Sequence, residues 1–155
     1  MKLKWKELFI AIFIPILIGL ISSFLSNNTT SSFNQLIKPP FSPPAWLFSI
    51  VWMTLYILMG VASYFIYISN DKNKKSALSL YALSLVFNFL WPILFFNFHL
   101  YFVSFLWIIA LEIIIILTIT SFYSICHLSA YLLIPYLVWV AFAAYLNYAI
   151  AILNK

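Results

Sequence analysis

Five long apolar runs take up most of this 155-residue chain, and they constrain its fold more than any other feature. Each run is long enough to cross a hydrocarbon core of about 30 Å, which takes roughly 20 helical residues. Lipid cannot satisfy open backbone groups, so uniformly apolar runs of this length should be helical. We therefore predict an all-α integral membrane protein, a five-transmembrane-helix bundle that forms a single membrane domain over residues 1–155. The expected helices cover residues 8–25, 45–68, 77–96, 100–126 and 128–153.

The composition excludes several other classes of protein. Hydrophobic side chains make up 66% of the chain and charged ones only 7%, which no water-soluble globular domain matches. The eight basic residues are all lysines in separate clusters, so the expected partner is the lipid bilayer and not nucleic acid. The single cysteine, Cys126, excludes an internal disulfide and a multi-thiolate metal site, and we expect no metal.

The positions of the lysines predict the orientation. With five spans, the amino terminus, the loop near Asp71 and the turn near His127 share one side, which holds six of the eight lysines. The positive-inside rule places that side in the cytoplasm and the carboxyl terminus outside. The first run lacks a clear signal-peptide cleavage site, so we expect it to remain as a helix that packs and anchors. Abundant Ile, Asn and Lys without Arg indicate an AT-rich bacterial genome, and therefore a bacterial plasma membrane.

A proline-rich segment, K-P-P-F-S-P-P-A-W, connects a polar loop to the second run. Its four prolines fix φ and disfavour helix at the preceding residues, so we expect an extended, rigid strap on the membrane surface. Pro44 suits the first position of the next helix, with Ser42 as its cap. Residues 27–43 form the only loop long enough to cover a site, which makes them the candidate lid.

Three of the expected helices carry aromatic and polar side chains on one face, at the three- and four-residue spacing of a helix. The faces are Phe48, Trp52, Tyr56, Met59 and Ser63 on the second run, Tyr81, Ser84, Asn88, Trp91 and Phe95 on the third, and Trp139, Ala143, Asn147, Ile150 and Asn154 on the fifth. Lipid cannot satisfy an asparagine amide or an indole N–H, so such faces should point inward.

Each face has two interpretations. Aromatic stripes are most often core packing, and Asn88 can form an interhelical hydrogen bond instead of binding a ligand. The small side chain of Ala143 allows either a close helix neighbour or one wall of a pocket. Pro92 should kink the third helix near Asn88 and free a carbonyl. If the faces line a pocket, its aromatic walls and few amides suit a flat, largely apolar ligand held by stacking.

Glu112 lies near the middle of the fourth run, and no basic residue exists in any expected span to pair with it. Desolvation favours the neutral acid, which can donate a hydrogen bond. A contact with another helix, with another subunit or with a wet cavity, and a proton relay, are all compatible with this position.

With these residues in view, the sequence resembles the translocator protein (TspO/MBR) family, also called the tryptophan-rich sensory proteins or peripheral benzodiazepine receptors. The resemblance covers residues 33–154 in order and spacing. It rests on K-P-P-F-S-P-P-A-W, V-W-M-T-L-Y-I-L-M-G-V-A, N-F-L-W-P-I-L-F-F and L-L-I-P-Y-L-V-W-V-A-F-A-A-Y-L-N. It implies a five-helix membrane bundle, often a homodimer, with a pocket open toward the first loop.

Members of that family bind porphyrins and haem, cholesterol in animals and synthetic benzodiazepine-type ligands, and some promote light-dependent breakdown of protoporphyrin. By motif position, the resemblance implies ligand-binding roles for Phe33, Pro43, Phe48, Trp52, Tyr56, Asn88, Trp91, Leu94, Trp139 and Ala143. Trp52 and Trp139 match the tryptophans implicated in the photochemistry, in which an indole donates an electron to an excited porphyrin. This chain departs from the family at Ser32, Phe33 and Phe41, where Trp, Tyr and Trp are common.

Two functions follow as hypotheses. The first is a membrane receptor-like protein that binds porphyrin or haem as a ligand, with no intrinsic cofactor, and that promotes light-dependent degradation or regulates tetrapyrrole metabolism. The second is a transporter of such ligands, although no paired repeat of broken helices is visible. A conventional enzyme has little support, because neither H-E-x-x-H nor G-x-S-x-G occurs and His99 and His127 fall on opposite sides.

Overall fold

The computed structural model of the protein describes residues 4–26 and 29–154, and within them it contains helices and no strand. The long helices are α1 (Trp5–Leu25), α3 (Ala45–Ile68), α4 (Lys74–Pro92, continued by the π-helix η1, Ile93–Asn97), α5 (Tyr101–Tyr123) and α6 (His127–Leu153). A short helix, α2 (Thr29–Gln35), lies between α1 and α3. The five long segments are apolar enough to cross a membrane, which confirms the predicted five-helix membrane bundle.

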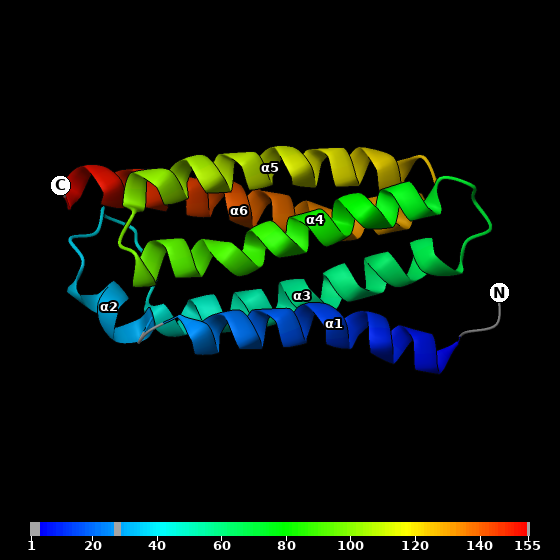
Figure 1. Cartoon of the computed structure of the whole chain (residues 1–155), viewed down its shortest axis with the longest axis horizontal. Coiled ribbons are helices and arrows are strands. Elements are labelled where there is room, and N and C mark those ends of the chain that lie inside the picture. Colours follow the sequence, from blue (N-terminus) through cyan, green and yellow to red (C-terminus); the bar gives the residue numbers. More distant parts are fainter. Residues whose placement is uncertain (1–3, 27–28, 155) are drawn as a thin grey trace.

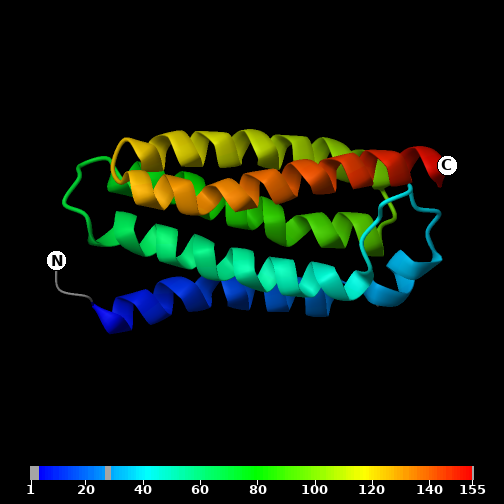
Figure 2. The same cartoon turned by 180° about the vertical axis from the view of Figure 1, so that it is seen from behind.

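The helices run side by side along one long axis. Figure 1 shows α4 between the pair α5 and α6 and the pair α1 and α3, with the two termini at opposite ends. The most extensive packing is between α5 and α6, between α1 and α3, and between α4 and α5. In the reverse view of Figure 2, α2 and the strap lie beside the carboxyl terminus. We call this the lid end, and the opposite end, with the loop at residues 69–73, the lysine end.

The helix boundaries differ from the predicted ones by up to three residues. α1 begins at Trp5 instead of residue 8, and α4 begins at Lys74 instead of residue 77. Both added turns carry lysines, whose stems can lie along apolar surface while the ammonium group stays in the headgroup layer. The helix can therefore extend beyond the apolar run. α5 ends at Tyr123 instead of residue 126, because the Ile125 N–H donates to the Phe122 carbonyl only three residues back (3.0 Å) and the backbone is extended at Cys126.

The strap is not extended throughout, so that prediction was wrong. Residues 39–42 form a turn in which the Ser42 N–H and Oγ both donate to the Pro39 carbonyl, at 3.3 and 2.9 Å. Phe41 has a φ of 70°, the positive value that a type II turn requires at its third position. The helix start at residue 45 is confirmed, but Pro44 is the extended residue before Ala45 instead of the first helical residue, and the Ser42 side chain bonds within the turn instead of capping α3.

The half of the bundle toward the lysine end is a packed core. Met59, Tyr64, Phe122 and Tyr136 are each at most 1% exposed. Gly60 allows α1 and α3 to touch, since a side-chain carbon at this position would overlap the backbone of Ile12. The half toward the lid end is packed less completely, and a cavity lies there.

Candidate functional site

A cavity of about 250 Å³ lies between α1, α3, α4 and α6, beneath the lid helix α2. The described residues that line it are uncharged and mostly aromatic or aliphatic. They are Ile16, Gly19, Leu20, Ser22 and Ser23 from α1, Phe33 from α2, Ala45, Phe48, Ser49, Trp52, Met53 and Tyr56 from α3, Asn88, Trp91 and Pro92 from α4, Phe95 and Phe96 from η1, and Ala143, Leu146, Asn147 and Ile150 from α6. The three predicted faces therefore meet at one space.

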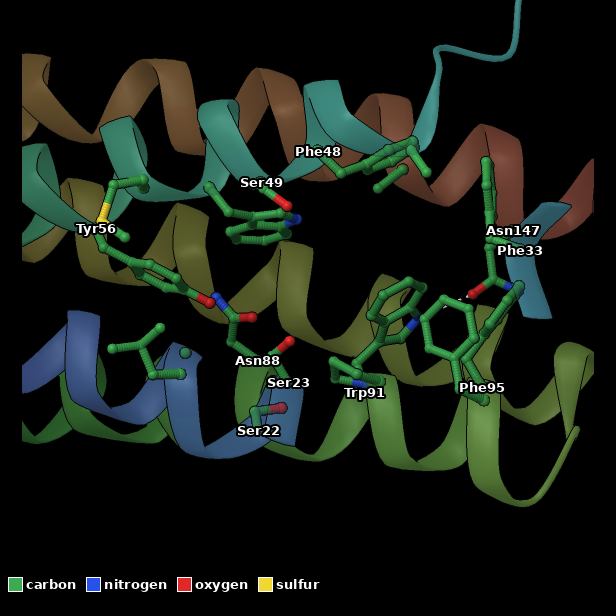
Figure 3. Close-up of a pocket in the computed structure, with 18 of the residues that line it drawn as sticks. Ser22, Ser23, Phe33, Phe48, Ser49, Tyr56, Asn88, Trp91, Phe95 and Asn147 are labelled. Carbon is green, nitrogen blue, oxygen red and sulfur yellow. Dashed lines mark hydrogen bonds between the residues drawn. The ribbon is translucent and has the colours of Figure 1, made fainter. Parts of the chain in front are cut away.

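Aromatic rings wall the end of the cavity nearest the lid. Phe33 of α2 packs edge-on against Phe48 of α3, with ring centroids 5.2 Å apart. Trp91 stacks on Phe95, with the same centroid separation of 5.2 Å. Figure 3 shows these rings gathered at one end of the cavity. A flat ring system placed among them can make both the stacked and the edge-to-face contacts that aromatic groups favour.

Asn147 holds the indole of Trp91 in place. Trp91 Nε1 donates to Asn147 Oδ1 (2.9 Å), and Asn147 Nδ2 donates to the Tyr101 carbonyl (2.7 Å). The asparagine is 1% exposed, so this network ties α4, α5 and α6 together inside the bundle. Both ends of the amide are used, and Asn147 therefore orients a wall of the cavity instead of offering a free polar group.

The middle of the cavity is more polar than its lid end. Figure 3 shows the Tyr56 hydroxyl of α3 and the Asn88 amide of α4 pointing toward each other. Asn88 Nδ2 also donates to the buried Tyr136 hydroxyl, at a long 3.4 Å. Asn88 thus makes an interhelical hydrogen bond and also lines the cavity, and a ligand-binding role for it stays a prediction. Trp52 stacks on Tyr56, with ring centroids 5.6 Å apart, and also lines the cavity.

Pro92 frees a carbonyl of α4, as predicted, and α1 binds to one nearby. The Ile93 N–H bonds to the Leu90 carbonyl, three residues back, instead of to Phe89. The Phe89 carbonyl accepts a hydrogen bond from Ser22 Oγ at 2.7 Å. The irregular hydrogen bonding of α4 next to Pro92 therefore leaves the Phe89 carbonyl available to Ser22, and this hydrogen bond holds α1 beside the cavity.

Seven of the ten residues that were predicted to bind ligand lie on the cavity wall. They are Phe33, Phe48, Trp52, Tyr56, Asn88, Trp91 and Ala143. Pro43 in the strap and Leu94 in η1 do not line the cavity. A π-helix puts more residues into each turn, and in η1 the residues that line the cavity are Phe95, which the predicted face included, and Phe96, and not Leu94. A binding role for the seven residues stays a prediction.

Trp139 lies one layer outside the cavity. Its ring packs edge-on against Phe48, with centroids 5.6 Å apart, and it lines a shallow apolar groove between α3 and α6. Among the described residues, nothing accepts a hydrogen bond from its buried Nε1. Trp52 lines the cavity itself, so the two tryptophans with an expected photochemical role occupy different environments.

Helix α1 forms part of the cavity wall, although it was expected only to pack and anchor. The signal was the group of small residues Gly19, Ser22 and Ser23 in an otherwise bulky helix. A side-chain carbon at Gly19 would overlap the Tyr56 ring, so the glycine makes room for that ring at the cavity wall. The lid was expected as a loop, but it contains α2, which buries Phe33 to 8% exposure.

Comparison with known proteins agrees with this architecture. The TspO/MBR family profile matches residues 11–153. The tryptophan-rich protein TspO of Archaeoglobus fulgidus is 38% identical over 138 residues, which are 88% of this chain and 90% of that protein. The translocator protein of Ovis aries is 38% identical over 117 residues, and these cover 74% of this chain and 69% of the relative. The tryptophan-rich sensory protein of Cereibacter sphaeroides is 30% identical over 122 residues, with coverage of 79% and 76%. The chain therefore belongs to the TspO/MBR family.

Proposed function

We propose that this protein binds porphyrin-type or haem-type tetrapyrroles, and similar flat apolar ligands, in the cavity beneath α2. The observation that carries the proposal is the combination of aromatic rings at the lid end with the Tyr56 and Asn88 side chains deeper inside. Such a site can stack a ring system and orient it with a few polar contacts. No histidine or cysteine is among the described lining residues, so the proposal rests on contacts with the ring and not on an axial bond from either of these residue types.

A ligand of this size requires the lid to move. The cavity of about 250 Å³ is smaller than the roughly 300–1,000 Å³ that is typical for sites of drug-sized ligands. A macrocycle of four pyrrole rings is at least as large as those ligands. Binding therefore needs α2 to shift, which separates Phe33 from Phe48 and opens the aromatic end.

Photochemistry, where it occurs, should depend on Trp52 more than on Trp139. Trp52 lines the cavity and can touch a bound ring, whereas the Phe48 ring lies between Trp139 and the cavity. Electron donation from an indole to an excited porphyrin weakens with distance. Light-dependent loss of the porphyrin absorbance band is therefore expected to slow more in Trp52→Phe than in Trp139→Phe.

A protoporphyrin titration of the purified protein in detergent tests the proposal. We expect saturable binding in the dark, followed by tryptophan quenching and porphyrin absorbance, that weakens about three- to tenfold in Trp52→Phe because a stacking face is reduced. Trp5→Phe is the matched control, since Trp5 is 63% exposed at the lysine end. Binding no tighter than to empty micelles, or equal losses in both variants, would contradict the proposal.

Transport across the membrane has less support than binding. Beyond Tyr56, the described part of the bundle is filled by buried side chains that include Met59, Tyr64 and Tyr136. A ligand that enters at the lid end therefore meets a packed core before it reaches the lysine end. Uptake of protoporphyrin into proteoliposomes that is lost in Trp52→Phe would favour the transport function.

A further inference from the structure

The cavity has no charged group to receive an anion. None of its described lining residues is a lysine, an aspartate or a glutamate. Burying a carboxylate in such a place without a partner is strongly unfavourable. Protoporphyrin and haem carry two propionate groups on one edge of the ring. That edge must therefore stay outside the aromatic walls, at the mouth of the cavity.

Lys38 does not line the cavity itself but lies next to a residue that does. Its Nζ is 4.7 Å from the ring centroid of Phe33, and Phe33 lines the cavity. Of the lysines in the described residues, Lys38 is the one at the lid end, because the others belong to the start of α1 or to residues 72–75. The Lys38 residue as a whole is half-buried.

The backbone beside Lys38 is held in place by the end of α6. Asn154 Oδ1 accepts a hydrogen bond from the Ile37 N–H (3.0 Å), and Asn154 Nδ2 donates to the Ile37 carbonyl (2.9 Å). On the other side, the turn that starts at Pro39 fixes the strap. The backbone at Lys38 is thus held by contacts on both sides.

The acidic residues of the chain are elsewhere. Glu7 is in the first turn of α1, Asp71 is in the loop before α4, and Glu112 is in the middle of α5. None of these three side chains belongs to the lid or the strap, so no aspartate or glutamate of the chain lies next to Lys38 in the sequence.

We propose that Lys38 is the anion-binding residue of this site and selects flat ligands that carry a carboxylate on one edge. The proposal rests on the proposed tetrapyrrole binding and adds the orientation of the ligand. The apolar edge enters first, toward Tyr56 and Asn88, and the propionates remain beside the Lys38 ammonium group. A charge-assisted contact of this kind is stronger than a neutral hydrogen bond.

The test compares protoporphyrin with its dimethyl ester, which keeps the ring and lacks the negative charges. Dissociation constants are measured in neutral detergent for the natural protein, Lys38→Met, Lys38→Arg and Lys72→Met. We expect Lys38→Met to weaken binding of the diacid about three- to tenfold and to leave binding of the ester unchanged. Lys38→Arg should retain most of the affinity, and Lys72→Met, at the lysine end, should change neither ligand. High salt should reduce only the difference between diacid and ester.

Two results would overturn this assignment while leaving the proposed function intact. Equal weakening of both ligands in Lys38→Met would mean that the lysine supports the lid through Phe33 and does not bind an anion. Unchanged binding of the diacid would exclude any role for the lysine. Failure of the natural protein to bind either porphyrin would instead overturn the proposed function, and with it this proposal.

Discussion

Replacing each of the two glycines by alanine adds one methyl group. We expect this change to affect mainly ligand binding at Gly19 and mainly folding stability at Gly60. In Gly19→Ala the new methyl group meets only the tip of the Tyr56 ring, which can turn. In Gly60→Ala it meets the backbone of Ile12, so α1 and α3 must move apart. We expect Gly19→Ala to weaken protoporphyrin binding about tenfold at unchanged thermal stability, and Gly60→Ala to lower the free energy of unfolding by about 1–3 kcal/mol. Titration and thermal unfolding in the same detergent measure both effects.

The paired design of these variants makes the outcome informative. Alanine favours helix over glycine, so any loss of stability in Gly19→Ala has to come from the clash with Tyr56. A large loss of stability in Gly19→Ala, or none in Gly60→Ala, would mean that the helix contacts described at these positions are wrong.

Glu112 is expected to reduce stability in the isolated chain. It is half-buried in the middle of α5, and among the described residues its buried Oε2 has no hydrogen-bond partner. An unsatisfied buried polar group costs about 1–3 kcal/mol. Glu112→Leu should therefore raise the unfolding temperature in detergent, whereas Glu112→Gln, which keeps a polar group, should stay near the natural protein. A lower unfolding temperature in Glu112→Leu would mean that a second copy or a lipid supplies a partner.

The inward direction of single side chains could be predicted from the sequence, but their partners could not. Asn88 and Asn147 were assigned to inward faces because lipid cannot satisfy an amide, and both are at most 5% exposed. That Asn147 binds the Trp91 indole depends on how α4 and α6 are rotated against each other. Trp139 shows the same limit, since it shares a face with Ala143 but lies on the outer side of Phe48.

At the scale of elements, the contact between the strap and α6 is expected to control ligand release. Asn154 makes two hydrogen bonds to the Ile37 backbone, and its amide also donates to the Ile150 carbonyl (3.0 Å). Asn154→Ala should speed protoporphyrin dissociation about thirtyfold, because it removes two hydrogen bonds to Ile37 that contribute about 1 kcal/mol each to lid closure. Stopped-flow dissociation into excess empty micelles measures the rate.

Asn73→Ala is the control for this experiment, since Asn73 is exposed at the lysine end and its side chain caps no helix. Equal dissociation rates in Asn154→Ala and in the natural protein would mean that lid opening does not limit release.

The long helices were predictable because each span must be apolar over its whole length. The local departures follow from hydrogen bonds that no average of hydropathy contains. The π-helix after Pro92, the turn at Phe41 and the short helix α2 all occur where the chain leaves regular spacing. These same departures shape the lid and the aromatic end of the cavity, so the candidate site was less predictable than the bundle that carries it.

At the scale of the whole molecule, the lysine end is predicted to face the cytoplasm. Labelling of single cysteines tests this orientation. In a Cys126→Ser background, Asn34→Cys lies in α2 and Asn70→Cys lies in the loop before α4, and both positions are exposed. A membrane-impermeant maleimide added to intact bacterial cells that express the variants should label position 34 and not position 70. Labelling of position 70 alone would reverse the orientation and place the cavity mouth toward the cytoplasm.

The number of spans and the separation of the two termini follow from the sequence alone, because an odd number of crossings puts the termini on opposite sides. The unequal packing of the two halves of the bundle cannot be predicted from the sequence alone. It depends on which side chains meet across α1, α3 and α4, and these helices have similar apolar composition.

The small volume of the closed cavity is expected to limit the association rate of a large ligand. A small aromatic molecule fits the existing space, so its rate of association should rise in proportion to its concentration. A porphyrin has to wait for α2 to open, and lid motions of this kind take microseconds to milliseconds. Its observed rate should therefore level off at high concentration, at the opening rate of the lid. Under the proposed function, capture of a porphyrin at high concentration is therefore limited by the motion of α2 and not by encounter with the protein.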